Sequence, residues 1–193
     1  MINQVITKLS ICNRALLMLN NTLMSSMEEE TKNGAYCSFL YPIIKEELLT
    51  SYNWKCAVGY DSLTFIEKLA NDNLSYPYKF ELPQDCLKVL LVDNANNFLK
   101  IGNNLFATAQ DIKIVYIKNI DEKDFDSNLG YLLSIKLALE LAYSLTLDGS
   151  LVSYLKALYQ EKFAQFSNLD SKTGGNIVYK EDQENTTWIN SHS

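Results

Sequence analysis

The feature that most constrains this chain of 193 residues is a nearly continuous apolar stretch between residues 129 and 147. The polar residues that align within it are Lys136, Glu140 and Ser144, which recur every four residues and so form one narrow row on a helix. Asp126 precedes the stretch and is a good N-cap. A helix this apolar is buried, either within the subunit or against copies of itself.

Three further helices are predicted from apolar residues that recur every three or four positions. In chain order, the three stripes are Val5, Leu9, Cys12, Leu16 and Leu19; Cys37, Leu40, Ile44 and Leu48; and Val152, Leu155, Tyr159, Phe163 and Phe166. The second helix is expected to begin near the acidic run at 28–30 and to kink or break at Pro42. Gly149 is expected to end the long helix, and Ser150 to cap the last one. We expect the long helix to pack against the first and fourth helices, with its polar row least buried.

Between the second and third helices the pattern changes to short extended runs, at 87–92, 98–101, 105–107 and 112–117. Turns rich in Asn and Asp separate these runs, which predicts a small antiparallel sheet set between helices. Before the first run stands YPYKFELPQDCLKVLLV, residues 76–92. Pro77 and Pro83 are expected to fix the joint where the chain passes from the helices into the sheet, with Trp54 packed across it.

The expected fold class is therefore α+β and mainly α: a helical bundle of about four helices with an inserted small antiparallel β-sheet and an extended C-terminal arm. The expected main domain spans 1–171, with a helical body at 1–58 and 124–171 and a β-rich insertion at about 60–120. The arm spans 172–193 and leaves the last helix through Gly174 and Gly175. Its few large apolar residues are the predicted partner-binding anchors: Ile177, Val178, Tyr179, Trp188 and Ile189.

Candidate catalytic residues are scarce. The single histidine, His192, stands next to the end of the polar arm, where a Ser-His-Asp or Cys-His arrangement has no rigid support. The four cysteines form no CxxC pair, and Cys12 and Cys37 fall on apolar helical faces. We therefore predict no catalytic, metal-binding or cofactor-binding residue, no cofactor and no enzymatic activity. One alternative stays open, because among 23 acidic residues some pair suited to glycan hydrolysis could lie close together.

The charge and hydropathy of the sequence restrict which partners the protein can bind. A net charge of −6 argues against a protein that grips nucleic-acid phosphates, which requires Lys and Arg. No apolar run approaches the length of a membrane span, and the start MINQVITKLS lacks the pattern of a signal peptide. We therefore expect a protein made in a cytoplasm, without membrane contact.

Five segments, taken in order, resemble motifs of phage head–tail connector proteins of the tail tubular protein A family. They are ICNRALLML at 11–19, Cys37 with the pair Tyr41-Pro42, SYNWKCA at 51–57, YKFELPQDCLKVL at 78–90 and DFDSNLGYLLSIKLALELAYSLT at 124–146. The resemblance runs from about residue 10 to 170. It departs from the family at Asn20, where the family has glycine, although asparagine also tolerates a left-handed backbone.

The resemblance implies a structural virion protein: a ring-forming adaptor, usually dodecameric, that docks on the portal of a short-tailed phage. Such an adaptor connects to the next tail component, a nozzle or tube. It continues the channel through which DNA passes without sequence-specific binding. The location would be the tail or neck of the virion after assembly in the host cytoplasm, and the arm would bind the portal or a neighbouring subunit. A tail-associated cell-wall glycan hydrolase and a cellular helical interaction protein are the alternatives.

Overall fold

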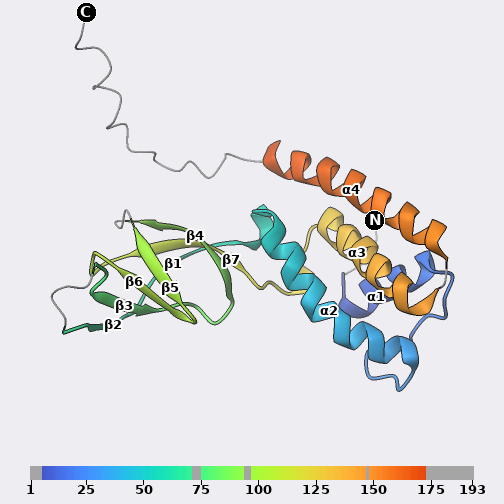
Figure 1. Ribbon diagram of the computed structural model, residues 1–193, viewed down its shortest axis with the longest axis horizontal. Helices are drawn as coiled ribbons and strands as arrows, with labels where there is room; N and C mark the ends of the chain where they lie inside the picture. The colour runs from blue at the N-terminus through green and yellow to red at the C-terminus, as the bar shows by residue number, and fades with distance from the viewer. Residues whose placement is uncertain (1–5, 71–74, 94–96, 147, 173–193) are drawn as a thin grey trace, which may run out of the picture.

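The computed structural model describes residues 6–70, 75–93, 97–146 and 148–172, which form a helical part and a β part lying end to end (Figure 1). The helical part contains α1 (Lys8–Met18), α2 (Lys32–Ser51), α3 (Ser127–Leu145) and α4 (Gly149–Lys172). The β part contains β1 (Val58–Ser62), β2 (Phe65–Lys68), β3 (Tyr78–Glu81), β4 (Cys86–Asp93), β5 (Phe98–Ile101), β6 (Asn104–Ala107) and β7 (Lys113–Lys118). Short 3-10 helices, Lys55–Ala57 and Glu122–Asp124, lie where the chain crosses between the two parts.

The expected fold class, a helical bundle with one small inserted sheet, is wrong. The strands form two antiparallel sheets, one of three strands in the order β1-β7-β4 and one of four in the order β2-β3-β6-β5. The four predicted extended runs correspond to β4, β5, β6 and β7, whereas β1, β2 and β3 were not predicted as strands. All four residues of β2 are exposed, so it lacks the alternation of apolar and polar residues that marks a half-buried strand.

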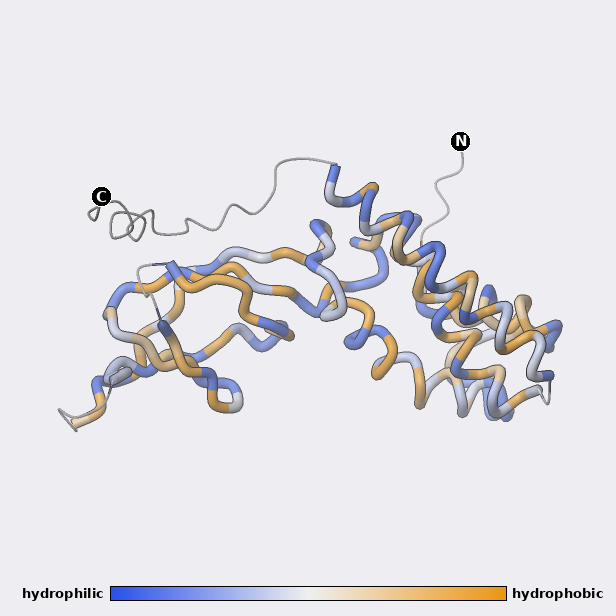
Figure 2. The backbone as a smooth tube through the Cα atoms, turned by 45° about the horizontal axis from the view of Figure 1, so that its top comes forward, coloured by the Kyte–Doolittle hydropathy of each residue, from blue (hydrophilic) through white to orange (hydrophobic). Residues whose placement is uncertain are grey.

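The β part has a hydrophobic core of its own. Eight side chains are buried between the two sheets: Phe80, Leu82, Val92, Leu105, Ala107, Ile112, Ile114 and Tyr116. Figure 2 accordingly shows hydrophobic residues along the strands as well as along the helices. A structure with two separate cores is therefore a better description than a helical body carrying a small insertion.

Two irregularities in β4 join the β part to the helical core. The pairing of β4 with β7 shifts between Cys86 and Lys88 and again between Val89 and Leu91. The skipped residues, Leu87 and Leu90, pack against the helical core, whereas Cys86 and Val89 pack against the core of the β part. Extra residues of this kind redirect side chains in an antiparallel pair, and here they let one strand contribute to both cores.

The helix α3 is the centre of the helical part, since α1, α2 and α4 all pack against it. Most of its apolar side chains are buried within the subunit, which was one of the two kinds of burial that its sequence left open. In the predicted polar row, Lys136 and Glu140 are half-buried and Ser144 is exposed, so this row is on the least buried side as predicted. The Nζ atom of Lys136 lies 2.9 Å from a carboxylate oxygen of Glu47 on α2.

Side chains at the predicted helix starts confirm some expectations and correct others. The Asp126 carboxylate accepts the Leu129 N–H at 2.7 Å, which confirms it as the N-cap of α3. The cap of α2 is Thr31, so this helix begins after the acidic run and not at it. The cap of α4 is Asp148, which accepts the N–H groups of Ser150 and Leu151, so Gly149 begins this helix instead of ending α3.

The backbone conformations at Asn20 and Pro42 test two predictions from the sequence. Asn20 has a φ of 51°, which confirms that it adopts the left-handed backbone at the end of α1. Of the kink or break expected at Pro42, the break is wrong, because α2 continues through this residue. Pro42 cannot donate to the carbonyl of Ser38, but both residues are exposed, so water can solvate that carbonyl.

The joint between the two parts lies elsewhere than predicted. Pro77 and Pro83 are inside the β part, on either side of β3. The chain crosses instead at residues 52–57 and 119–126, and Trp54 is fully buried at the first crossing. Its indole ring meets Tyr52 with 4.8 Å between centroids and Phe163 of α4 with 5.8 Å. The indole Nε1–H donates to the Leu48 carbonyl at 2.9 Å. Trp54 therefore packs at the joint as expected, but the prolines do not fix it.

A polar cluster holds the second crossing. The Glu122 carboxylate accepts the Tyr41 hydroxyl at 2.9 Å and forms an ion pair of 3.1 Å with Lys45. Burial is the largest single effect on the pKa of Glu122, and it favours the neutral form of the carboxyl group. Hydrogen bonds from its own backbone N–H, Lys45 and Tyr41 outweigh burial and lower its pKa below the ordinary value. The carboxylate is therefore ionised in the native protein and ties α2 to the segment that returns from the β part.

Replacing Glu122 with glutamine should lower the free energy of unfolding by about 1–3 kcal/mol at neutral pH, because Lys45 then loses its charged partner. A carboxyl group whose pKa is lower in the folded than in the unfolded state stabilises the protein at pH values above its unfolded pKa, about 4.3. This stabilisation is lost as the pH falls through the pKa of the folded state. The difference between wild type and Glu122→Gln, measured by urea unfolding, should therefore shrink below about pH 4. A difference that stays constant from pH 7 to pH 3 would contradict this role.

Candidate functional site

The predicted partner-binding residues, Ile177, Val178, Tyr179, Trp188 and Ile189, lie outside the described residues. The same holds for His192 and for the whole predicted arm except Lys172, which is the last residue of α4. Their role stays a prediction. The described residues nevertheless contain exposed apolar surfaces that the sequence reading did not identify, and these are candidate contact sites.

One such surface is the outer side of α2, formed by Ala35, Phe39, Pro42, Ile43 and Glu46, all exposed; we call it the α2 face. Phe39 is 69% exposed and Ile43 is 53% exposed, and they lie one helical turn apart. The other side of the helix carries Cys37, Tyr41, Ile44 and Leu48 into the core. Adjacent large apolar side chains that face solvent mark a contact site more often than isolated ones do.

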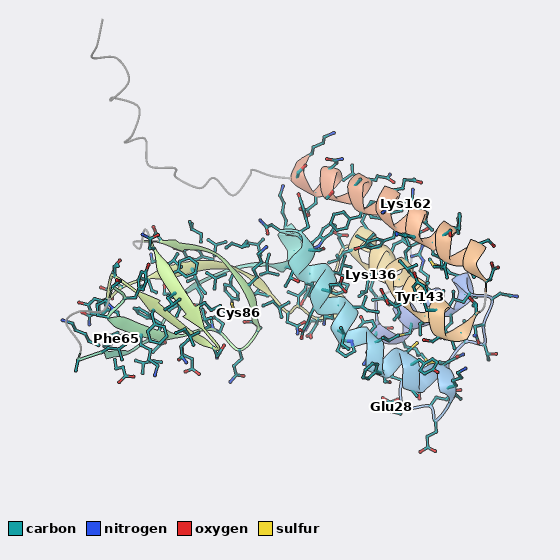
Figure 3. The ribbon with its side chains drawn as sticks, viewed as in Figure 1. Glu28, Phe65, Cys86, Lys136, Tyr143 and Lys162 are labelled. Atoms are coloured by element: carbon teal, nitrogen blue, oxygen red, sulfur yellow. The ribbon has the colours of Figure 1, made fainter. Side chains whose placement is uncertain are left out.

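The α2 face continues toward α3. Glu47, next to Glu46 on α2, contacts Lys136 on α3, and the ammonium group of Lys136 lies 5.3 Å from the ring centroid of Tyr159 on α4. Figure 3 shows Lys136 and Tyr143 on α3 between α2 and α4. Tyr143 is 65% exposed. This side of the helical part is thus built from three helices and presents exposed aromatic and aliphatic groups.

A second apolar surface lies at an edge of the four-stranded sheet. The strand β5 is the last in the order β2-β3-β6-β5, and all four of its residues are exposed. Leu99 is opposite Phe106 of β6, and Ile101 is opposite Asn104. Among the described residues β5 pairs only with β6, so its other edge offers backbone groups beside exposed apolar side chains, a combination that favours pairing with another chain.

One cleft, of about 260 Å³, opens in the β part between the β1–β2 and β3–β4 connections. Its lining residues are Asp61, Ser62, Leu63, Thr64, Glu81, Leu82, Pro83 and Gln84. Asp61 and Glu81 both line this cleft, and the hydrolase alternative requires a pair of carboxylates that flank one bound sugar. The Asp61 carboxylate already accepts the N–H of Ser62 at 2.8 Å.

All four described cysteines are free thiols, and two of them lie side by side in the helical core. Cys12 and Cys37 are fully buried, as predicted, and none of the four cysteines is in a disulfide. The hydrogen bond between Cys12 and Cys37 raises the pKa of the Cys12 thiol, together with burial, and lowers the pKa of the Cys37 thiol. Burial raises the pKa of Cys56 to about 11. Cys12 and Cys56, whose pKa values are raised, therefore stay protonated at neutral pH.

Metal ligands and membrane spans can be assessed only within residues 6–70, 75–93, 97–146 and 148–172. There, no three or more His, Cys, Asp or Glu side chains gather in a way that could hold a metal ion. Within the same ranges no helix is long and apolar enough to cross a membrane.

The residues that stand out in the described structure form surfaces for contact and one small polar cleft. The sequence signal for the α2 face was the pair Phe39 and Ile43, which lies on the opposite side of the helix from the predicted stripe. Searches against protein-family models and against curated proteins found no match to this chain.

Proposed function

We propose that this protein is a structural virion protein, a ring-forming head-to-tail adaptor of a short-tailed phage. In this role copies of the chain form a ring, as a dodecamer, that docks on the portal and binds the next tail component. DNA leaves through the channel of the ring without sequence-specific binding. The collinear resemblance to head–tail connector proteins of the tail tubular protein A family motivates the proposal.

The observation that carries the proposal is the α2 face. A monomer has no need to expose Phe39 and Ile43 side by side on a helix whose opposite side already supplies core residues. Contact between copies would remove both side chains from water. Burying a large apolar side chain is worth about 1.5–3 kcal/mol.

The shape of the molecule supports an adaptor as well. The helical part and the β part lie end to end, and each exposes apolar side chains, on α2 in the first and on β5 in the second (Figure 1). An adaptor must bind copies of itself and two different neighbours along the tail axis. Separate surfaces on two parts of an elongated chain are suited to that task.

Replacing Phe39 with aspartate should abolish assembly, because the contact would then bury an unpaired charge. Native mass spectrometry should find wild type as a particle of many copies and Phe39→Asp as a monomer. The side chain is exposed in the single chain, so the variant should keep the far-UV circular dichroism spectrum of a folded protein. Tyr154→Asp is the matched control, since Tyr154 is an exposed aromatic on α4 and is 62% exposed.

Particle mass also separates the adaptor from its alternatives. A chain that is monomeric at every attainable concentration would contradict the ring and favour a cellular interaction protein. The cleft with Asp61 and Glu81 is the observation that favours a glycan hydrolase. Release of sugars from peptidoglycan by the purified chain, lost on Asp61→Asn or Glu81→Gln, would overturn the adaptor proposal.

A further inference from the structure

We propose that the ring contact joins two different helices of neighbouring copies: an α1 face, formed by Arg14 and Leu17, and the α2 face of the next copy. Arg14 would pair with Glu46, and Leu17 would pack on Ile43. The inference rests on the proposed function and identifies the surfaces and the ion pair by which one copy recognises the next.

Arg14 is the only arginine of the chain and is exposed on α1. Its guanidinium carbon lies 3.9 Å from the ring centroid of Tyr131 on α3, and the Tyr131 ring contacts Phe166 on α4 with 6.3 Å between centroids. This stacking orients the guanidinium group. Among the described residues Arg14 forms no ion pair within 4.0 Å, so its hydrogen-bond donors are available for a carboxylate of another molecule.

Glu46 provides the matching charge. It is exposed on the α2 face, and within the described part of the chain no lysine or arginine nitrogen lies within 4.0 Å of its carboxylate. The neighbouring glutamate differs, because Glu47 is already paired with Lys136. Arg14 and Glu46 are thus an unpaired cation and an unpaired anion on two exposed helical surfaces.

The apolar residues have the same spacing as the charges. Leu17, 61% exposed, follows Arg14 by three residues, and Ile43, 53% exposed, precedes Glu46 by three residues. Residues three apart are neighbours on a helix surface. When α1 of one copy packs antiparallel to α2 of another, Arg14 meets Glu46 and Leu17 meets Ile43 together. Charge and apolar surface are therefore complementary in one orientation.

The two faces lie on two different helices of the helical part. In Figure 1, α3 passes in front of α1, whereas α2 runs along the lower left side of the helices, and both pack against α3. When subunits join in a row through two different faces, one copy of each face stays free at the two ends of the row. Such a head-to-tail contact closes into a ring when the rotation between subunits permits.

Charge reversal tests the pair directly. Arg14→Glu alone and Glu46→Arg alone each place like charges opposite one another, which should weaken assembly by at least about tenfold. An equimolar mixture of the two single variants should regain wild-type assembly, because every contact in an alternating particle then pairs opposite charges. The double variant Arg14→Glu, Glu46→Arg should also assemble. Mass photometry over a concentration series measures all four samples.

Matched controls carry the same charge changes elsewhere. Lys156→Glu alters an exposed residue of α4, and Glu28→Arg alters an exposed residue at the far end of the helical part (Figure 3). Both controls should assemble as wild type does. Recovery in the mixture also shows that the single variants are folded.

The outcomes separate this inference from the proposed function. Single variants that assemble like wild type, or a mixture that stays monomeric, would overturn the Arg14–Glu46 pairing while leaving the ring in place. A wild-type chain that never assembles would overturn the ring itself, and the pairing with it.

Discussion

Replacing Trp54 with alanine is expected to lower the free energy of unfolding by about 3–5 kcal/mol, the range for a large aromatic removed from a core. The side chain is 1% exposed and fills the space between the end of α2 and the α4 residue Phe163. Its loss also leaves the Leu48 carbonyl without the indole donor. Urea unfolding followed by circular dichroism measures the effect.

Two further variants separate packing from hydrogen bonding at Trp54. Trp54→Phe keeps most of the apolar volume but removes the donor, so it should cost about 1–3 kcal/mol. Tyr154→Ala, at an exposed aromatic position, should change stability by no more than about 0.5 kcal/mol. A Trp54→Ala variant as stable as this control would contradict the buried joint.

Replacing Leu137 or Leu141 with alanine is expected to cost about 2–5 kcal/mol each, because both side chains are completely buried on α3. The cost combines lost burial with the cavity that remains, and α3 is surrounded by three other helices, which limits how far the site can collapse. Equilibrium unfolding in urea measures both variants. Leu23→Ala is the matched control, since Leu23 is 46% exposed, lies outside the proposed contact faces and should change stability by less than about 0.5 kcal/mol. Unchanged midpoints for Leu137→Ala and Leu141→Ala would show that the burial of α3 is wrong.

The helix α3 and its surroundings could be predicted from the sequence because the pattern there has one interpretation. Its apolar stretch is interrupted by a single polar row, and Asp126 supplies an unambiguous cap. The left-handed Asn20 was predictable for a similar reason, since few residue types tolerate that backbone.

The β part was underestimated because its first strands carry weak local signals. β1 reads VGYDS, which contains a glycine and an aspartate, both poor strand formers. Its strand conformation comes from pairing with β7, a partner more than fifty residues later. Pairing between distant segments is a tertiary effect that local periodicity does not reveal, and for this reason one small sheet was expected where two exist.

The contact surfaces were missed for a different physical reason. The helix α2 is apolar on two sides, and sequence spacing does not say which side meets the core. Only the packing of α3 against one side shows that Phe39 and Ile43 face solvent. The five predicted anchors in the arm lie outside the described residues and stay a prediction.

Because Val58 pairs with Ile117, the chain enters and leaves the β part through adjacent strands. The helices α1 and α2 are separated in sequence from α3 and α4 by this whole segment, so joining them in an unfolded chain means closing a long loop. The entropy of loop closure grows with the logarithm of loop length. Once β1 and β7 have paired, only the short crossing segments remain to be closed, which lowers the entropic cost of assembling the helical core by about 1–2 kcal/mol. In the folded protein the pairing of β1 with β7 thus keeps the ends of the two helical pairs close together.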